Sequence, residues 1–201
     1  TLANPSIENW PEVVPEAADV MEDFTFIGNR IYVTYLHDAS NSIRVFEMNG
    51  TPVGELDVPP FHSASVRGGG DGDVLLTVSG FLTPSTVWRV DPGTGERTLE
   101  EGPEVAWDGS AYEVKQVWRT SRDGTRAPMF VVQRKGIELD GSHPTYLTGY
   151  GGFYVARKPG FSATAALWLE MGGVYAVATL RGGSEYGEAW HRDGWRENKQ
   201  H

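Results

Sequence analysis

Two neighbouring stretches decide the fold class: PTYLTGYGGF at residues 144–153 and SATAALWLEMGGVYAVATL at residues 162–180. The first is a short apolar run that ends in a glycine-rich turn. In the second, residues 163–171 have the Ala, Leu and Trp content of a helix, and a pair of glycines stops it. Residues 174–180 follow as a continuous apolar run, typical of a strand covered on both faces in a parallel sheet. This order of strand, turn, helix and strand predicts the opening of an α/β domain.

The first half of the chain has a different pattern, in which short runs rich in β-branched or aromatic residues alternate with turn signals. Asn49-Gly50 and Asp91-Pro92-Gly93 are examples of these signals, because Gly or Asn can take the positive φ that a tight hairpin requires. The runs predict strands at residues 24–27, 31–36, 43–48, 74–79 and 86–90. Two groups of about four mostly antiparallel strands are expected, at the rough spacing of β-propeller blades.

The amino-acid composition excludes several kinds of site and partner. With no cysteine among its 201 residues, it can form no disulfide, thiolate metal site or cysteine nucleophile. The net charge is −10, and residues 1–104 hold most of it, with 17 acidic against 5 basic side chains. Nucleic acids and anionic membranes both require a basic surface, so neither is an expected partner.

The first residue of the chain and the length of its apolar runs indicate whether it is soluble and whether it is part of a longer protein. No run approaches the roughly 20 apolar residues that cross a bilayer, so we expect a soluble chain, compatible with cytoplasm or periplasm. The chain begins at Thr1 rather than at a methionine, which favours a segment of a longer protein. An isolated pair of blades would leave sheet faces and edges uncovered, so we expect the chain alone not to be a stable monomer.

Three familiar functional motifs were considered, and the sequence matches each of them only in part or not at all. Ser184 lies in a Gly-Gly-Ser-Glu-Tyr context, but a nucleophile elbow needs a glycine where Tyr186 stands. A dinucleotide fingerprint beginning at Gly149 would need its third glycine where Tyr154 stands. The histidines show no metal-ligand spacing, and His37-Asp38 is expected to be an ordinary turn.

The turn that contains Tyr150, Gly151, Gly152 and Phe153 invites a functional interpretation. Residues without Cβ atoms let the backbone and a flanking aromatic ring approach a ligand closely at the carboxyl end of a sheet strand. In α/β-hydrolases the corresponding turn supplies contacts to the oxyanion. Glycines that merely pack the turn would give the same sequence, so the residues alone leave both interpretations open.

Several phrases, in order and spacing, resemble the prolyl oligopeptidase family of serine peptidases, and the resemblance covers essentially the whole chain. The phrases are Tyr35-Leu36-His37-Asp38, Phe81-Leu82-Thr83-Pro84, Ser121-Arg122-Asp123-Gly124-Thr125, Lys135-Gly136-Ile137, Leu139-Asp140-Gly141-Ser142-His143-Pro144, Gly149-Tyr150-Gly151-Gly152-Phe153, Met171-Gly172-Gly173-Val174 and Arg181-Gly182-Gly183-Ser184-Glu185-Tyr186-Gly187-Glu188-Ala189-Trp190-His191.

The resemblance implies a division of the chain and a role for two side chains. Residues 1–104 would be the last two blades of a β-propeller, and residues 105–201 the first strands and helix of an α/β-hydrolase domain. Tyr150 would donate its hydroxyl to the oxyanion, and Phe153 would line the pocket for the substrate proline. The nucleophile and the rest of the Ser-Asp-His triad would lie beyond His201, and neither a cofactor nor a metal is implied.

The expected function is therefore hydrolysis of peptides on the carboxyl side of proline, by a protein of which this chain and further segments are parts. Two alternatives stay open. The chain alone would be a catalytically silent structural or binding fragment. The related oligopeptidase B branch, which cuts after basic residues, resembles the same region but lacks the Tyr-Gly-Gly-Phe form of the turn.

Overall fold

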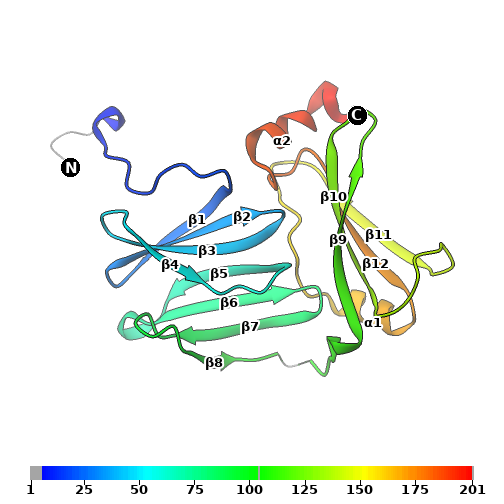
Figure 1. Cartoon of the computed structure of the whole chain (residues 1–201), viewed down its shortest axis with the longest axis horizontal. Helices are drawn as coiled ribbons and strands as arrows, with labels where there is room; N and C mark the ends of the chain where they lie inside the picture. The colour runs from blue at the N-terminus through cyan, green and yellow to red at the C-terminus, as the bar shows by residue number, and fades with distance from the viewer. Residues whose placement is uncertain (1–5, 104, 201) are drawn as a thin grey trace.

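The structure, a computed structural model, describes residues 6–103 and 105–200 and consists mainly of three four-stranded sheets (Figure 1). The first sheet has the order β1-β2-β3-β4 and is antiparallel throughout. Its strands are β1 (Val20–Ile27), β2 (Arg30–His37), β3 (Ser40–Glu47) and β4 (Pro52–Leu56). The second sheet repeats this meander with β5 (His62–Gly68), β6 (Val74–Gly80), β7 (Thr83–Val90) and β8 (Arg97–Glu101).

The third sheet has the order β11-β12-β10-β9 and carries the two α-helices of the described part of the chain. Its strands are β9 (Tyr112–Thr120), β10 (Arg126–Arg134), β11 (Thr145–Tyr150) and β12 (Val174–Thr179). The helices are α1 (Ala163–Glu170) and α2 (Gly187–Asp193), with short 3₁₀ turns at η1 (Ile7–Asn9), η2 (Gly70–Gly72), η3 (Gly109–Ala111) and η4 (Arg196–Gln200). Over residues 6–103 and 105–200, no helix has the length and apolar character needed to cross a bilayer.

The two groups of four antiparallel strands are confirmed, but three of their members gave no strand signal. These three strands, β4, β5 and β8, lie at the edges of their sheets. β4 and β8 are mostly exposed, and β5 buries only Ala64, so none of them needs the apolar runs that mark β2 and β6. Sequence patterns detect buried strands, because it is burial that selects apolar residues.

The expectation of a parallel sheet around residues 174–180 is right on one side of the strand and wrong on the other. β12 pairs in parallel with β11, through the helix α1 that crosses between them. It pairs antiparallel with β10. The reason is that the chain reverses direction in the loop of residues 135–144, so β10 and β11 run in opposite directions.

Helix α1 begins and ends as its sequence predicts. The Ser162 side chain caps the first turn, accepting a hydrogen bond from the backbone N–H of Ala165 at 3.3 Å. The helix ends before Gly172, whose φ of +90° is costly for other residues. Leu169, on the buried face, packs in the core of the third sheet.

The first two sheets pack face to face over a core of nine buried side chains. Those of the first sheet are Ile27, Tyr32, Ile43 and Val45, and those of the second are Ala64, Val74, Leu76, Val78 and Val90. Strict alternation of buried and half-buried positions along β6 places one of its faces in this core. Two stacked antiparallel meanders are the result.

The hairpins β2–β3 and β6–β7 both point at the third sheet (Figure 1). Ala39, in the first hairpin turn, is fully buried, and Phe81, in the second, is 6% exposed. Both belong to one core cluster with Phe130 of β10 and Leu169 of α1. The meanders and the third sheet are therefore joined by apolar packing, and this junction lies beside the candidate site.

Candidate functional site

The candidate site lies at the carboxyl end of the parallel pair β11 and β12. Tyr150 is the last residue of β11 and pairs with Thr179 of β12, so both strands end at the same edge of the sheet. We name residues 150–157, which leave β11 here, the site turn. Residues 180–187, which leave β12 beside it, are the back loop. Ligands of open α/β sheets bind at this edge.

The site turn and the back loop touch backbone to backbone, and Gly151 makes this contact sterically feasible. A Cβ atom at position 151 would lie 2.5 Å from the carbonyl oxygen of Arg181 and 2.6 Å from Cβ of Leu180. At Gly152, one residue further, the nearest atoms would be 3.8 Å away, in the ring of Tyr150. The sequence marked both glycines alike, but only Gly151 is required by packing.

The two side chains predicted to act on substrate both reach solvent from this turn. Tyr150 is 41% exposed and Phe153 is 88% exposed, which is unusual for an apolar ring. Phe153 and Tyr154 have φ of 52° and 58°, a strained conformation for residues with side chains. Strain of this kind persists only where the surroundings enforce it and is common at functional sites.

A hollow of about 540 Å³ opens on one side of the site turn and is lined in part by Phe153, Tyr154 and His191. The ring of Tyr154 meets that of His191 edge to face, with 5.2 Å between centroids. His191 Nδ1 lies 2.7 Å from the carbonyl oxygen of Gly182, and Lys199 Nζ donates to the carbonyl oxygen of Gly151. Helix α2 and η4 thus contact the site turn and the back loop and stabilise the turn.

The back loop is also tied to the hairpin between β9 and β10. The guanidinium of Arg181, only 10% exposed, pairs with Asp123 and donates from Nη1 to Oγ1 of Thr125 at 3.2 Å. The hydrogen bond from Arg181, followed by that from the Thr125 backbone, lowers the pKa of Asp123 to about 2. Asp123 therefore stays ionised at neutral pH, and the tie persists.

Ser184 and the histidines, the other residues considered in the sequence, do not come together as a catalytic group in the described part of the chain. The Ser184 side chain is buried, at 8% exposure, and its carbonyl oxygen accepts from Gly187. His191 faces a backbone carbonyl, as described above. Among the residues that the structure describes, no three acidic or histidine side chains gather as a metal site would require.

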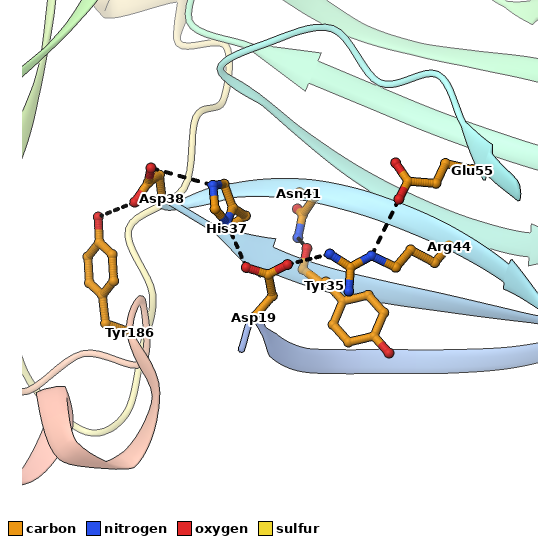
Figure 2. A network of polar contacts seen from close by, with 8 residues as sticks. All are labelled: Asp19, Tyr35, His37, Asp38, Asn41, Arg44, Glu55 and Tyr186. Atoms are coloured by element: carbon orange, nitrogen blue, oxygen red, sulfur yellow. Dashed lines mark hydrogen bonds and ion pairs between the residues drawn. The ribbon is translucent and has the colours of Figure 1, made fainter. Parts of the chain in front are cut away.

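The turn His37-Asp38, predicted from the sequence to be an ordinary turn, links the first sheet to the back loop (Figure 2). Tyr186 donates its hydroxyl to Oδ1 of Asp38 at 3.3 Å, and Gln116 Nε2 donates to the carbonyl oxygen of Asp38 at 2.9 Å. Burial, and then the neighbouring Asp38, raises the pKa of Tyr186. The chain does turn here, but Asp38 and Ala39 both have a positive φ, 47° and 61°, and the contacts of Asp38 lie in two other elements.

Behind this turn, His37 and Arg44 share one carboxylate. Nδ1 of His37 lies 2.6 Å from Oδ1 of Asp19, and Arg44 pairs with the other oxygen (Figure 2). The hydrogen bond from His37 to the carboxylate of Asp19 raises the pKa of His37. Burial acts to raise the pKa of Asp19, but the hydrogen bonds from His37 and Arg44 outweigh it and the net shift is downward. No signal in the sequence pairs residues so far apart.

Comparison with known proteins gives two family matches. The model described as "Prolyl oligopeptidase, N-terminal beta-propeller domain" matches residues 1–102, and "Prolyl oligopeptidase family" matches residues 159–201. A prolyl endopeptidase of Elizabethkingia meningoseptica is 36% identical over 202 residues, and one of Elizabethkingia miricola is 34% identical. Each alignment covers 100% of this chain but 28% of the relative, so the chain spans under a third of the length of these enzymes.

Solved structures agree in fold over nearly the whole chain. One, from a study entitled "Structural and Mechanistic Analysis of Two Prolyl Endopeptidases", superposes with a TM-score of 0.92 at 39% identity and covers 98% of this chain and 30% of that one. Prolyl oligopeptidase B of Galerina marginata, bound to a 35mer hydrolysis and macrocyclization substrate, superposes with a TM-score of 0.86 at 32% identity, covering 94% and 28%. From its matched sequence and its superposed fold, the chain belongs to the prolyl oligopeptidase family.

Proposed function

We propose that this chain is part of a serine endopeptidase that hydrolyses peptides on the carboxyl side of proline. The observation that carries the proposal is the site turn, which presents a phenol and a phenyl ring to solvent at the carboxyl end of β11. Membership of a family whose relatives are named prolyl endopeptidases supports it. The Galerina marginata structure is described as bound to a 35mer hydrolysis and macrocyclization substrate, which supports an oligomeric ligand such as a peptide here.

Within this enzyme the chain would supply two regions. Residues 1–104 would form two blades of the propeller, one from each antiparallel meander. Residues 105–201 would form the first part of the α/β-hydrolase domain, with β9–β12 as its first strands. The change from stacked meanders to a mixed sheet with a crossing helix supports a boundary near residue 105.

Tyr150 would act on the tetrahedral intermediate. When a serine attacks the carbonyl carbon of the bond after proline, the carbonyl oxygen gains negative charge, and a phenol donor aimed at it stabilises the transition state more than the ground state. The hydroxyl of Tyr150 suits this task, because its side chain is 41% exposed at the sheet edge and its backbone is fixed by pairing with Thr179.

Phe153 would hold the substrate proline. A pyrrolidine ring is flat and apolar and packs well on an aromatic face. The left-handed backbone at Phe153 points its ring away from the core, where 88% of it stays accessible. The nucleophile and its partner Asp and His would come from segments outside residues 1–201, and the chemistry calls for no cofactor.

The test uses the full-length protein that carries this chain. It should release a chromogenic group attached after proline and should be inactivated by a serine-directed phosphonate. Replacing Phe153 by Ala should raise KM for the proline peptide by about tenfold or more, because a buried aromatic contact is lost. Cleavage after Arg or Lys in place of proline would assign the protein to the oligopeptidase B branch and overturn the proposal.

A further inference from the structure

Glu185, in the back loop, is a buried carboxyl group for which the proposed reaction has no use. Only 1% of it is exposed. Acidic side chains are seldom buried this fully unless they are paired or hydrogen-bonded, because moving a charge out of water is costly. A carboxyl group buried at this cost is expected to hold another part of the structure in place.

The contact that Glu185 makes is with the far end of the site turn. Its Oε1 accepts a hydrogen bond from the backbone N–H of Arg157 at 2.7 Å. Its Oε2 has no hydrogen-bond partner within the described part of the chain. The carboxyl occupies the space beside Gly183, where an added Cβ would overlap Oε2 and lie 2.8 Å from the carbonyl oxygen of Val155. Gly183 therefore leaves room for the carboxyl against the turn.

The site turn is held in place at its start, in its middle and at its end, and Glu185 holds the end. Tyr150 is fixed at its start by the sheet. In the middle, the N–H of Tyr154 donates to the carbonyl oxygen of Gly182 at 3.3 Å, a long hydrogen bond. At its end the 2.7 Å hydrogen bond from the N–H of Arg157 to Oε1 of Glu185 ties the strained segment to the back loop.

We propose that Glu185 is a positioning residue, which fixes the end of the site turn and thereby holds Tyr150 and Phe153 in their working orientation. The inference rests on the proposed function of the turn. Glu185 itself touches no substrate, and it acts through the backbone of Arg157.

The ionisation of Glu185 gives the stability of the fold a pH dependence. Burial raises the pKa of Glu185, against the opposing effects of the Arg157 N–H, the Trp190 indole N–H and the charge of Arg157, and the other titratable group facing it is Tyr186. The folded state therefore binds a proton more tightly than the unfolded state, whose carboxyl has the ordinary pKa of 4.5. Stability is lost as the pH rises from that value through the raised pKa.

Three variants of the full-length protein test the proposal. Glu185→Ala should lower kcat on a proline peptide by about 10²-fold, because small misplacements of a catalytic group are costly. Glu185→Gln keeps an oxygen that can accept from Arg157 and should retain kcat within about threefold. The matched control is Glu188→Gln, an exposed acid on α2 paired with Arg192, which should leave kcat unchanged.

The unfolding temperature of the wild-type protein should fall as the pH rises through the raised pKa of Glu185, whereas Glu185→Gln should lack this component. The Gln variant also separates positioning from a general loss of structure. A large loss of kcat in Glu185→Gln with the Arg157 N–H still protected from exchange would overturn the proposal, even if Glu185→Ala does not fold.

Amide hydrogen exchange separates a failure of this inference from a failure of the proposed function. Glu185→Ala should speed exchange at residues 154–158 by roughly tenfold, since the Arg157 N–H loses its acceptor. If Tyr150→Phe proves harmless while this exchange effect is present, the proposed function fails and the role of Glu185 stands. Unchanged exchange and unchanged kcat in Glu185→Ala would overturn the inference alone.

Discussion

At the scale of single residues, Gly151 and Gly152 are neighbours in one motif but differ in their surroundings. Both belong to the same Tyr-Gly-Gly-Phe phrase, and the sequence alone could not rank them. The structure separates them, because the backbone of the back loop fills the space where Gly151 would carry a side chain and leaves space at Gly152. The difference depends on how two segments some 30 positions apart in the chain meet, which local pattern cannot encode.

Gly151→Ala should therefore lower the free energy of unfolding by about 1–3 kcal/mol, the usual cost of forcing a methyl group into a filled site. The obstruction is a backbone carbonyl and a Cβ atom, neither of which can rotate away. Gly152→Ala is the control and should change stability by less than about 0.5 kcal/mol. Urea unfolding of the two variants checks this, and equal stabilities would show that the turn and the back loop do not touch.

At the scale of elements, sequence pattern predicted the buried strands and the capped helix and missed the edge strands β4, β5 and β8. Residues 43–48 and 74–79 were found because β3 and β6 are buried and apolar. β8 was missed because four of its five residues are exposed. The parallel sheet predicted around residues 174–180 is only partly right, because β12 pairs antiparallel with β10, and this direction depends on the path of the loop between β10 and β11 and not on either strand.

His37, at the end of β2, pairs with Asp19, which precedes β1, and the effect of this pair on stability depends on pH. The pKa of His37 is raised above its ordinary value of 6.5, first by its hydrogen bond to Asp19. Its contribution is therefore fully present below pH 6.5 and is lost as the pH rises through the raised pKa. Because His37 is mostly exposed, solvent screening limits the contribution to about 0.2–1 kcal/mol.

Thermal unfolding at a series of pH values measures this contribution. The stability difference between wild type and His37→Gln should shrink as the pH rises above 6.5. In an Asp19→Asn background the same comparison should show a weaker trend, because the largest cause of the raised pKa of His37 is removed. A difference that stays constant with pH would mean that His37 does not pair with Asp19.

At the scale of the whole molecule, one face of the first sheet is apolar and uncovered. Met21 is 43% exposed, Phe24 56%, Phe26 58% and Met48 46%. With Val13, Val14, Ile31 and Val33 they line a hollow of about 420 Å³. A contiguous apolar surface of this kind marks an interface, and in a propeller it would meet a neighbouring blade on the side away from the second sheet.

The 201-residue chain on its own should consequently self-associate. Sedimentation should show a mass that rises with concentration, and the double variant Phe24→Ser, Phe26→Ser should reduce the association. Leu139→Ser removes an equally exposed apolar side chain, at 56%, from an isolated position in a loop and should leave the association unchanged. A concentration-independent monomer with cooperative unfolding would contradict this expectation.

In the proposed peptidase the site turn provides the oxyanion donor, the hydroxyl of Tyr150, and this role can be tested by removing that hydroxyl alone. Tyr150→Phe in the full-length protein removes a hydroxyl and little else, so kcat on a proline peptide should fall by about 10²–10³-fold with KM nearly unchanged. Tyr146→Phe, in the same strand at 48% exposure, is the matched control and should keep full activity. If Tyr150→Phe turned over as fast as this control, the turn would not be the oxyanion site.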